Sequence, residues 1–130
     1  MFMIHQTDDG RVAGIEYIPC GAIAPKVGQA LYMNAGVLAV ASGTTKPTYV
    51  SMCERETAVT AGDLIPVVRV NADMIFGTTF SASATSVKPG MKVTIANGGE
   101  QVTATTTDGI AEVVAMDGTA AGSAVLVRFA

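Results

Sequence analysis

The fold is decided by two runs, Gly28-Gln29-Ala30-Leu31-Tyr32-Met33 and Gly90-Met91-Lys92-Val93-Thr94-Ile95. Each run is followed by Asn and Gly residues, then by a longer apolar stretch (49–54 or 112–117), an Ala-Gly pair and a closing apolar stretch (67–70 or 126–129). A repeat of about 40 residues usually encodes one supersecondary unit twice, and neither unit can bury its apolar face alone. We therefore expect two similar, hairpin-rich repeats, at about 27–70 and 87–130, that pack together.

The composition between these runs favours strands joined by tight turns. The chain contains 14 glycines, and Asn34-Ala35-Gly36, Asn97-Gly98-Gly99, Asp108-Gly109 and Asp117-Gly118 provide residues that tolerate a positive φ. Val, Thr and Ala dominate the stretches between them, which is typical of strands. The expected strands are 29–33, 37–41, 48–53, 64–70, 78–82, 91–95, 101–105, 110–116 and 124–129. The predicted fold class is all-β, as a small barrel or a sandwich.

Two segments lie outside the repeats. Residues 1–26 contain Pro19 and Pro25 and are interpreted as an extended N-terminal arm, whereas 71–86 is interpreted as a linker within the β domain at 27–130. The arm carries apolar residues for which the sequence suggests no partner within the chain, so we expect it to dock on a neighbouring molecule. Its candidate contact residues are Ile4, Ile15, Tyr17 and Ile18.

Two arginines are further candidates for contacts with a neighbouring subunit. Arg69 and Arg128 occupy similar places in the two repeats, each between apolar strand residues. Arginine is enriched at protein interfaces. An outward-facing strand arginine whose aliphatic stem covers apolar surface explains the pattern equally well.

The balance of apolar and charged residues points to an assembly. Hydrophobic residues make up 49% of the chain and charged residues 15%, against about 25% charged in an average soluble domain. A domain of this size cannot bury all of its apolar surface, so contacts between subunits are expected, as a homotrimer or a homodimer. The net charge of −3, the absence of a basic stripe and the scarcity of aromatic residues argue against nucleic-acid binding. No apolar run is long enough for a membrane-spanning helix.

The residues that carry enzyme or metal chemistry are missing or isolated. His5 is the sole histidine, and Asp8-Asp9 precede Gly10 in a turn signal. Cys20 and Cys53 have neither zinc nor disulfide-framework spacing, so we expect two buried, reduced thiols. No catalytic, cofactor or metal site is predicted, and the protein is expected not to be an enzyme. The first residues lack a secretory signal pattern, which favours synthesis in a cytoplasm.

One lysine leaves a carrier function open. The run Gly90-Met91-Lys92-Val93 loosely resembles the Met-Lys hairpin tip of biotinyl and lipoyl carrier domains, which are also small two-fold β structures. Lys92 falls at the start of a predicted strand rather than in a tight turn, and a solvent-facing strand lysine explains it as well.

Four stretches carry a resemblance to a known family: Pro25–Met33, Thr45–Glu56, Ala61–Val70 and Val102–Val114. Together they resemble small proteins encoded beside the major capsid proteins of tailed phages, over residues 15–130. The resemblance implies a head decoration, or cement, protein that binds the major capsid protein on the virion exterior and is made in the host cytoplasm. In that family the N-terminal arm commonly meets the capsid. A tail-tube or head-fibre module, and an enzyme whose site forms between subunits, remain as alternatives.

Overall fold

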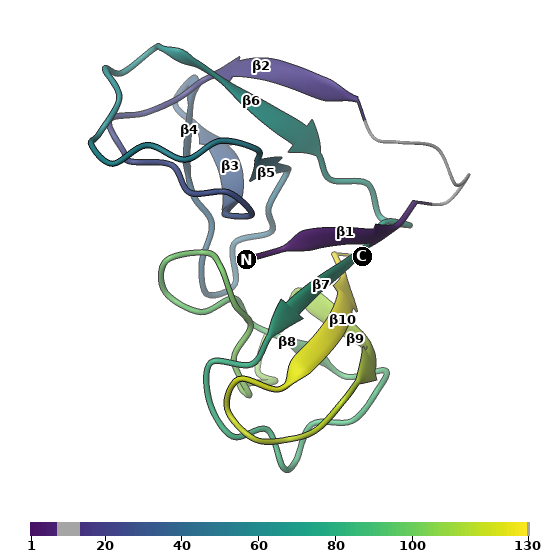
Figure 1. The fold of residues 1–130 in the computed structure, drawn as a ribbon. Helices are drawn as coiled ribbons and strands as arrows, with labels where there is room; N and C mark the ends of the chain where they lie inside the picture. The colour runs from purple at the N-terminus through teal and green to yellow at the C-terminus, as the bar shows by residue number, and fades with distance from the viewer. Residues whose placement is uncertain (8–13, 130) are drawn as a thin grey trace.

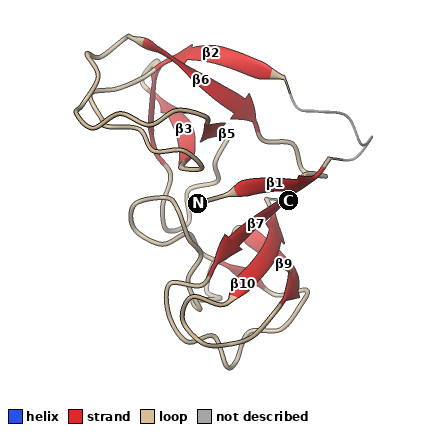
Figure 2. Ribbon diagram, in the orientation of Figure 1, coloured by secondary structure: helices blue, strands red, loops and turns tan. Residues whose placement is uncertain are grey.

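The structure is a computed structural model that describes residues 1–7 and 14–129 (Figure 1). These residues form ten strands and no helix (Figure 2). The strands are β1 (Met3–Gln6), β2 (Ile15–Pro19), β3 (Ala30–Asn34), β4 (Val37–Val40), β5 (Tyr49–Ser51), β6 (Leu64–Arg69), β7 (Ile75–Thr79), β8 (Lys92–Val93), β9 (Ala111–Met116) and β10 (Ala124–Arg128). The all-β prediction is therefore confirmed.

The strands form two five-stranded antiparallel sheets that pack together. The first sheet has the order β2-β6-β5-β3-β4, and the second has the order β1-β7-β10-β9-β8. Neither sheet closes by continuous strand pairing; in the first sheet the edges meet only at an isolated bridge, from Cys20 after β2 to Leu38 in β4. The barrel alternative is therefore wrong, and the architecture is two open sheets.

The two ends of the segment predicted to be an arm belong to different sheets. β1 pairs with β7 of the second sheet, and β2 pairs with β6 of the first (Figure 1). Phe2, just before β1, is 2% exposed and packs in the main core. The expectation that this segment has no partner within the chain is wrong for its described residues. The predicted Asp8-Asp9 turn lies outside the described residues.

The segment predicted to be a linker also contributes a strand, β7, which occupies in the second half the place that β2 occupies in the first. The amide of Cys20 donates to the carbonyl of Asp63, the residue before β6. In the same way, the amide of Phe80 donates to the carbonyl of Ser123, the residue before β10. Ile15–Pro19 and Ile75–Thr79 share almost no residue types, so a sequence comparison does not reveal this match. The limits of the sequence repeat itself stay a prediction.

The hydrogen bonds also correct the predicted equivalence of the two arginines. The Gly28 amide donates to the Ser51 carbonyl, and the Gly90 amide donates to the Val113 carbonyl, so Ser51 and Val113 occupy equivalent places. Ser51 pairs with Val67 in the first half, and Val113 pairs with Val127 in the second. Counting from these pairs, Arg69 corresponds to Phe129, one residue beyond Arg128. The strand pairing therefore matches the two closing strands with a shift of one residue relative to the sequence comparison, which aligns 67–70 with 126–129.

The predicted turn at 34–36 is present as a tight hairpin with a two-residue loop. Ala35 and Gly36 have φ values of 52° and 87° and join β3 to β4, as in a type I′ hairpin. The strand expected at 101–105 is reduced to isolated bridges that Val102 makes with Phe80 and Ile95. The Thr94 and Thr103 hydroxyls form a hydrogen bond of 2.7 Å beside these bridges.

β6 contributes buried side chains to two core clusters, which lie on opposite faces of its sheet. Val67 belongs to a smaller apolar cluster on one face of the first sheet, with Cys20, Leu31 and Leu38. Val68 points the other way, into the larger cluster between the two sheets. Full burial of such side chains stabilises a fold by about 1.5–3 kcal/mol each.

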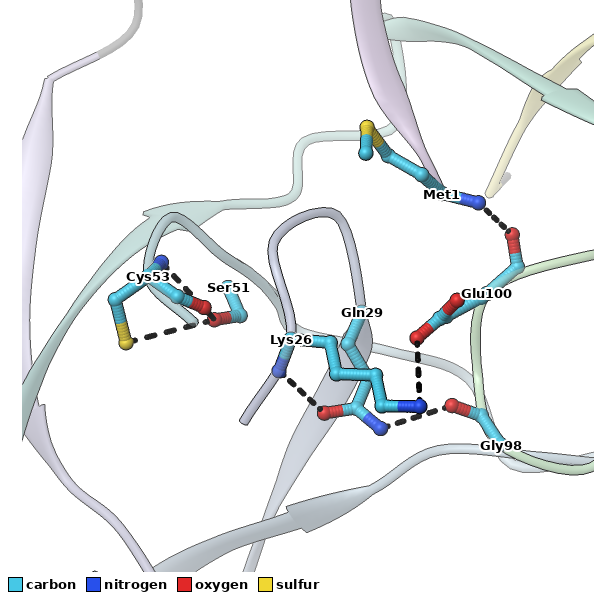
Figure 3. A network of polar contacts seen from close by, with 7 residues as sticks. All are labelled: Met1, Lys26, Gln29, Ser51, Cys53, Gly98 and Glu100. Carbon is cyan, nitrogen blue, oxygen red and sulfur yellow. Dashed lines mark hydrogen bonds and ion pairs between the residues drawn. The ribbon is translucent and has the colours of Figure 1, made fainter. Parts of the chain in front are cut away.

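The junction between the halves includes a buried amide (Figure 3). Gln29 is 6% exposed; its Nε2 donates to the Gly98 carbonyl at 2.9 Å, and its Oε1 accepts from the Lys26 amide at 3.2 Å. Gly99 follows with φ of 71°, and an added Cβ would lie 2.9 Å from a methyl group of Val40 and 3.0 Å from two carbonyl oxygens. The turn at 97–99 therefore fits closely against the first sheet.

Candidate functional site: an exposed apolar face

Within 1–7 and 14–129, no group of three or more His, Cys, Asp or Glu side chains could hold a metal ion. Lys92 lies in β8 opposite Glu112 of β9, and not at a hairpin tip. The features that suggest a function are therefore surfaces.

The face of the first sheet that carries Val68 packs on the second sheet in part, and the rest of it is apolar and exposed. Cross-strand neighbours in an antiparallel pair project on the same face. In β2, Ile15, Tyr17 and Pro19 lie opposite Val68, Pro66 and Leu64 of β6. These side chains therefore share one face. Met52, just after β5, continues the pairing with β6, because its amide donates to the Pro66 carbonyl at 3.0 Å, and so it lies on the same face.

A groove of about 220 Å³ continues this face toward β1. Four of its lining residues are buried: Phe2, Gly28, Val50 and Val68. The others are the more exposed Met1, Met3, Ile4, Val27 and Met52. Since β1 belongs to the second sheet, the groove lies where the two sheets meet (Figure 1).

We call the whole surface the apolar face; it comprises Met1, Met3, Ile4, Ile15, Tyr17, Val27, Met52, Leu64 and Pro66. Four of its members are more than half exposed: Tyr17 (64%), Met3 (62%), Leu64 (59%) and Ile15 (56%). None of its side chains is charged; the N-terminal ammonium of Met1 donates to the Glu100 carbonyl. Contiguous exposed apolar surface of this kind usually marks a site where another protein binds.

The structure brings together three of the six candidate contact residues. Ile4, Ile15 and Tyr17 all lie on the apolar face. Ile18 lies opposite Ile65 and packs against the smaller core cluster on the other face of the sheet. Ile18 is therefore an inward-facing residue of β2.

Both candidate arginines form ion pairs within the chain, away from the apolar face. Arg69 donates to both carboxylate oxygens of Glu16, at 3.0 and 3.1 Å, and its guanidinium lies 5.2 Å from the ring centre of Tyr49. The hydrogen bonds to Glu16 raise the pKa of Arg69 above its already high ordinary value, and Tyr49 adds to this effect. Arg128 pairs with Glu112 at 3.0 Å.

The remaining members of the face were missed from the sequence, although β6 contains a usable signal. Leu64 and Pro66 alternate with Ile65 and Val67, so the strand is apolar on both faces. An antiparallel strand with one wet face normally alternates apolar and polar residues. Met52 and Val27 carry no comparable signal, because their exposure depends on where β1 lies.

Both cysteines are free and buried, as expected. Burial away from water raises the pKa of the Cys20 thiol, and the nearby Cys53 and Asp63 raise it further. In the protonated form Cys20 acts as a small apolar side chain of the smaller core cluster. These thiols are therefore packing groups.

No helix in the described ranges could cross a lipid bilayer. No protein-family model matches this chain, and no curated protein is similar enough in sequence to count as a relative.

Proposed function

We propose that this protein is a non-enzymatic structural subunit that binds the outer surface of a tailed-phage capsid and stabilises the mature head. The resemblance over residues 15–130 supports the choice of partner. The observation that carries the proposal is the apolar face, where large uncharged side chains from both sheets remain exposed around one groove. The face includes Ile4, Ile15 and Tyr17, three residues that the sequence singles out for contact.

The mechanism requires binding energy and no reaction. Covering a half-exposed side chain such as Tyr17 or Leu64 contributes about 1 kcal/mol. The sum over the face must exceed the cost of immobilising the subunit on the shell. A ligand that binds only the mature lattice stabilises that lattice by mass action, so a subunit spanning a capsomer boundary resists its opening.

The groove suggests how the contact is centred. Interfaces concentrate their energy in a few large side chains that fill fully desolvated pockets. Three of the groove's lining residues are methionines (Met1, Met3 and Met52), whose unbranched side chains adapt readily to a partner's shape. One bulky apolar side chain of the major capsid protein is the expected occupant.

A matched pair of substitutions tests this proposal. Met52 lines the groove, and Met91 lies immediately before β8 of the other sheet; both are 41% exposed. Purified wild-type, Met52→Lys and Met91→Lys proteins would be mixed with mature heads that lack the protein. Binding would be measured by co-sedimentation, and stabilisation by the temperature at which the heads release DNA.

We expect the wild type and Met91→Lys to bind and to raise the release temperature. Met52→Lys should bind at least tenfold more weakly, because a cation replaces an apolar group in the groove. Failure of the wild type to bind heads would refute the capsid assignment. Equal binding by the two variants would refute the role of the apolar face, and binding to tails alone would favour a tail component.

A further inference from the structure

The turn at 96–99 contains one peptide unit that no hydrogen bond holds. The Gly99 amide donates to the Ala96 carbonyl at 3.1 Å and closes the turn. Gly98 has a φ of 91°, as at the second central position of a type II turn, so Asn97 occupies the first. In the part of the chain that the structure describes, neither the Asn97 carbonyl nor the Gly98 amide has a hydrogen-bond partner. The planar unit that these two groups share is therefore free to rotate.

The residues on both sides of this unit are anchored. The Gly98 carbonyl accepts from Gln29 Nε2 at 2.9 Å (Figure 3), and the Gly99 carbonyl accepts from the Ala30 amide at 2.7 Å. On the other side, Ala96 forms hydrogen bonds through both its amide and its carbonyl. The fold thus fixes the ends of the turn and leaves its central peptide unit mobile.

The side chain of Asn97 has access to the backbone nitrogen that follows it. Both Asn97 and Gly98 are exposed, and a Cβ added at Gly98 would meet nothing within 4 Å. Within the described residues, the side-chain amide of Asn97 forms no hydrogen bond that would hold it elsewhere. Asparagine is among the chemically labile residues of proteins. Here its labile group lies beside an unshielded nucleophile.

We infer that Asn97 is a site of spontaneous covalent modification in the folded protein. The Gly98 nitrogen attacks the side-chain carbonyl carbon of Asn97, a C–N bond forms, and the side-chain amide nitrogen leaves as ammonia with the proton from Gly98. Water then opens the resulting succinimide ring. Cleavage at the side-chain carbon leaves aspartate, and cleavage at the main-chain carbon leaves isoaspartate. In either case the Gly98 nitrogen regains a proton, and the new carboxyl group releases one to solvent.

The other two asparagines of the chain lack this arrangement. Asn34 and Asn71 are each followed by alanine, whose Cβ hinders approach to the backbone nitrogen. Asn34 is also paired with Val37 in the β3–β4 hairpin, and the Asn71 carbonyl accepts from the Met74 amide at 3.1 Å. They provide two internal controls for Asn97.

The modification acts on the junction between the halves. Isoaspartate adds a carbon to the main chain just before Gly98 and so displaces the carbonyl that Gln29 binds. Gly99 has little room to follow, because a Cβ there would already lie 2.9 Å from a methyl group of Val40. A buried amide that loses its partner costs stability. Formation of isoaspartate therefore loosens the junction, whether or not the protein binds a capsid.

A timed incubation of the purified protein tests the inference. Native protein, urea-unfolded protein and native Asn97→Gln protein would be held in mildly alkaline buffer, well below the melting temperature. Glutamine keeps the amide but closes the corresponding ring much more slowly. Peptide mass spectrometry would follow the loss of each asparagine amide, enzymatic methylation would detect isoaspartate, and melting temperatures would be recorded at each time.

We expect native Asn97 to lose its amide nearly as fast as in the unfolded chain, while Asn34 and Asn71 keep theirs. The melting temperature should fall as isoaspartate accumulates, and that of Asn97→Gln should stay constant.

The inference is overturned if native Asn97 keeps its amide while the unfolded chain loses it, since the fold would then protect the turn. Loss at Asn34 or Asn71 as fast as at Asn97 also overturns it. A protein that is rich in isoaspartate at position 97 but melts with Asn97→Gln would overturn the effect on the junction.

Discussion

Phe2 and Phe129 pack edge to face, with ring centroids 5.3 Å apart, so residues from opposite ends of the chain share one core. Phe129 also contacts Phe76 at 5.6 Å, which joins β1, β7 and β10 through aromatic rings. The Phe2 amide donates to the Gly28 carbonyl at 2.8 Å and so ties the same residue to the first half. Phe2 therefore links both sheets.

Phe2→Ala should lower the free energy of unfolding by about 3–5 kcal/mol, because it opens a cavity between the sheets. Met3→Ala is the matched control, since Met3 follows in the chain but is 62% exposed. It should change stability by less than about 0.5 kcal/mol. Urea unfolding followed by circular dichroism measures both changes, and equal effects would contradict the linking role of Phe2.

Gly99→Ala and Gly98→Ala should separate close packing from backbone strain. Both residues have positive φ, 71° and 91°, so either substitution costs about 1–2 kcal/mol from strain. Only the Gly99 Cβ would press against the first sheet, whereas the Gly98 Cβ would enter open space. Gly99→Ala should therefore lower the melting temperature clearly more than Gly98→Ala, and the reverse order would argue against a close fit at this turn.

Gln29→Met should destabilise the junction even though the side-chain volume is nearly unchanged. The substitution leaves the Gly98 carbonyl and the Lys26 amide without their side-chain partner, at a cost of about 1–3 kcal/mol. Gln6→Met, at an exposed position of β1, should have little effect. Chemical unfolding of the two variants side by side provides the measurement, and equal stability would remove the amide from the account of the junction.

Stability should decline in alkaline solution because of Cys20. Its pKa is raised in the folded protein, so the thiol stays protonated there while the unfolded chain ionises above about pH 8.5. The stabilising contribution is therefore complete below that pH and is lost as the pH rises toward the folded-state pKa. Cys20→Ala should show a smaller decline in melting temperature between neutral and alkaline pH than the wild type. An identical decline would assign the effect to other groups.

The sequence predicts the strands of this fold better than it predicts their partners. Glycine and asparagine turns identify the β3–β4 hairpin, because a two-residue loop with two positive φ values leaves few choices. β1 and β2 are missed because strand pairing at long separation has no local signature. Only the sheet pairing in the structure shows that β1 pairs with β7 and that β2 pairs with β6.

The candidate surface shows the same limit. Apolar residues in the first 26 positions indicate a contact role for Ile4, Ile15 and Tyr17, and the structure places all three on one face. Ile18 was grouped with them because strand alternation was not applied to a segment interpreted as an arm. Arg69 was named without its partner, since Glu16 lies far away in the chain and meets it only through the β2–β6 pairing.

The pairing of β1 with β7 also sets the order in which the protein can fold during synthesis. β1 leaves the ribosome first, but β7 follows only after the whole first sheet has been made, and Phe129 comes later still. Until then the nascent chain carries an unpaired strand with exposed Met and Ile side chains, which is a hazard for aggregation. Long-range pairing of this kind also slows folding. We therefore expect the first half to depend on the second for its final closure, and the two sheets to fold and unfold as one cooperative unit.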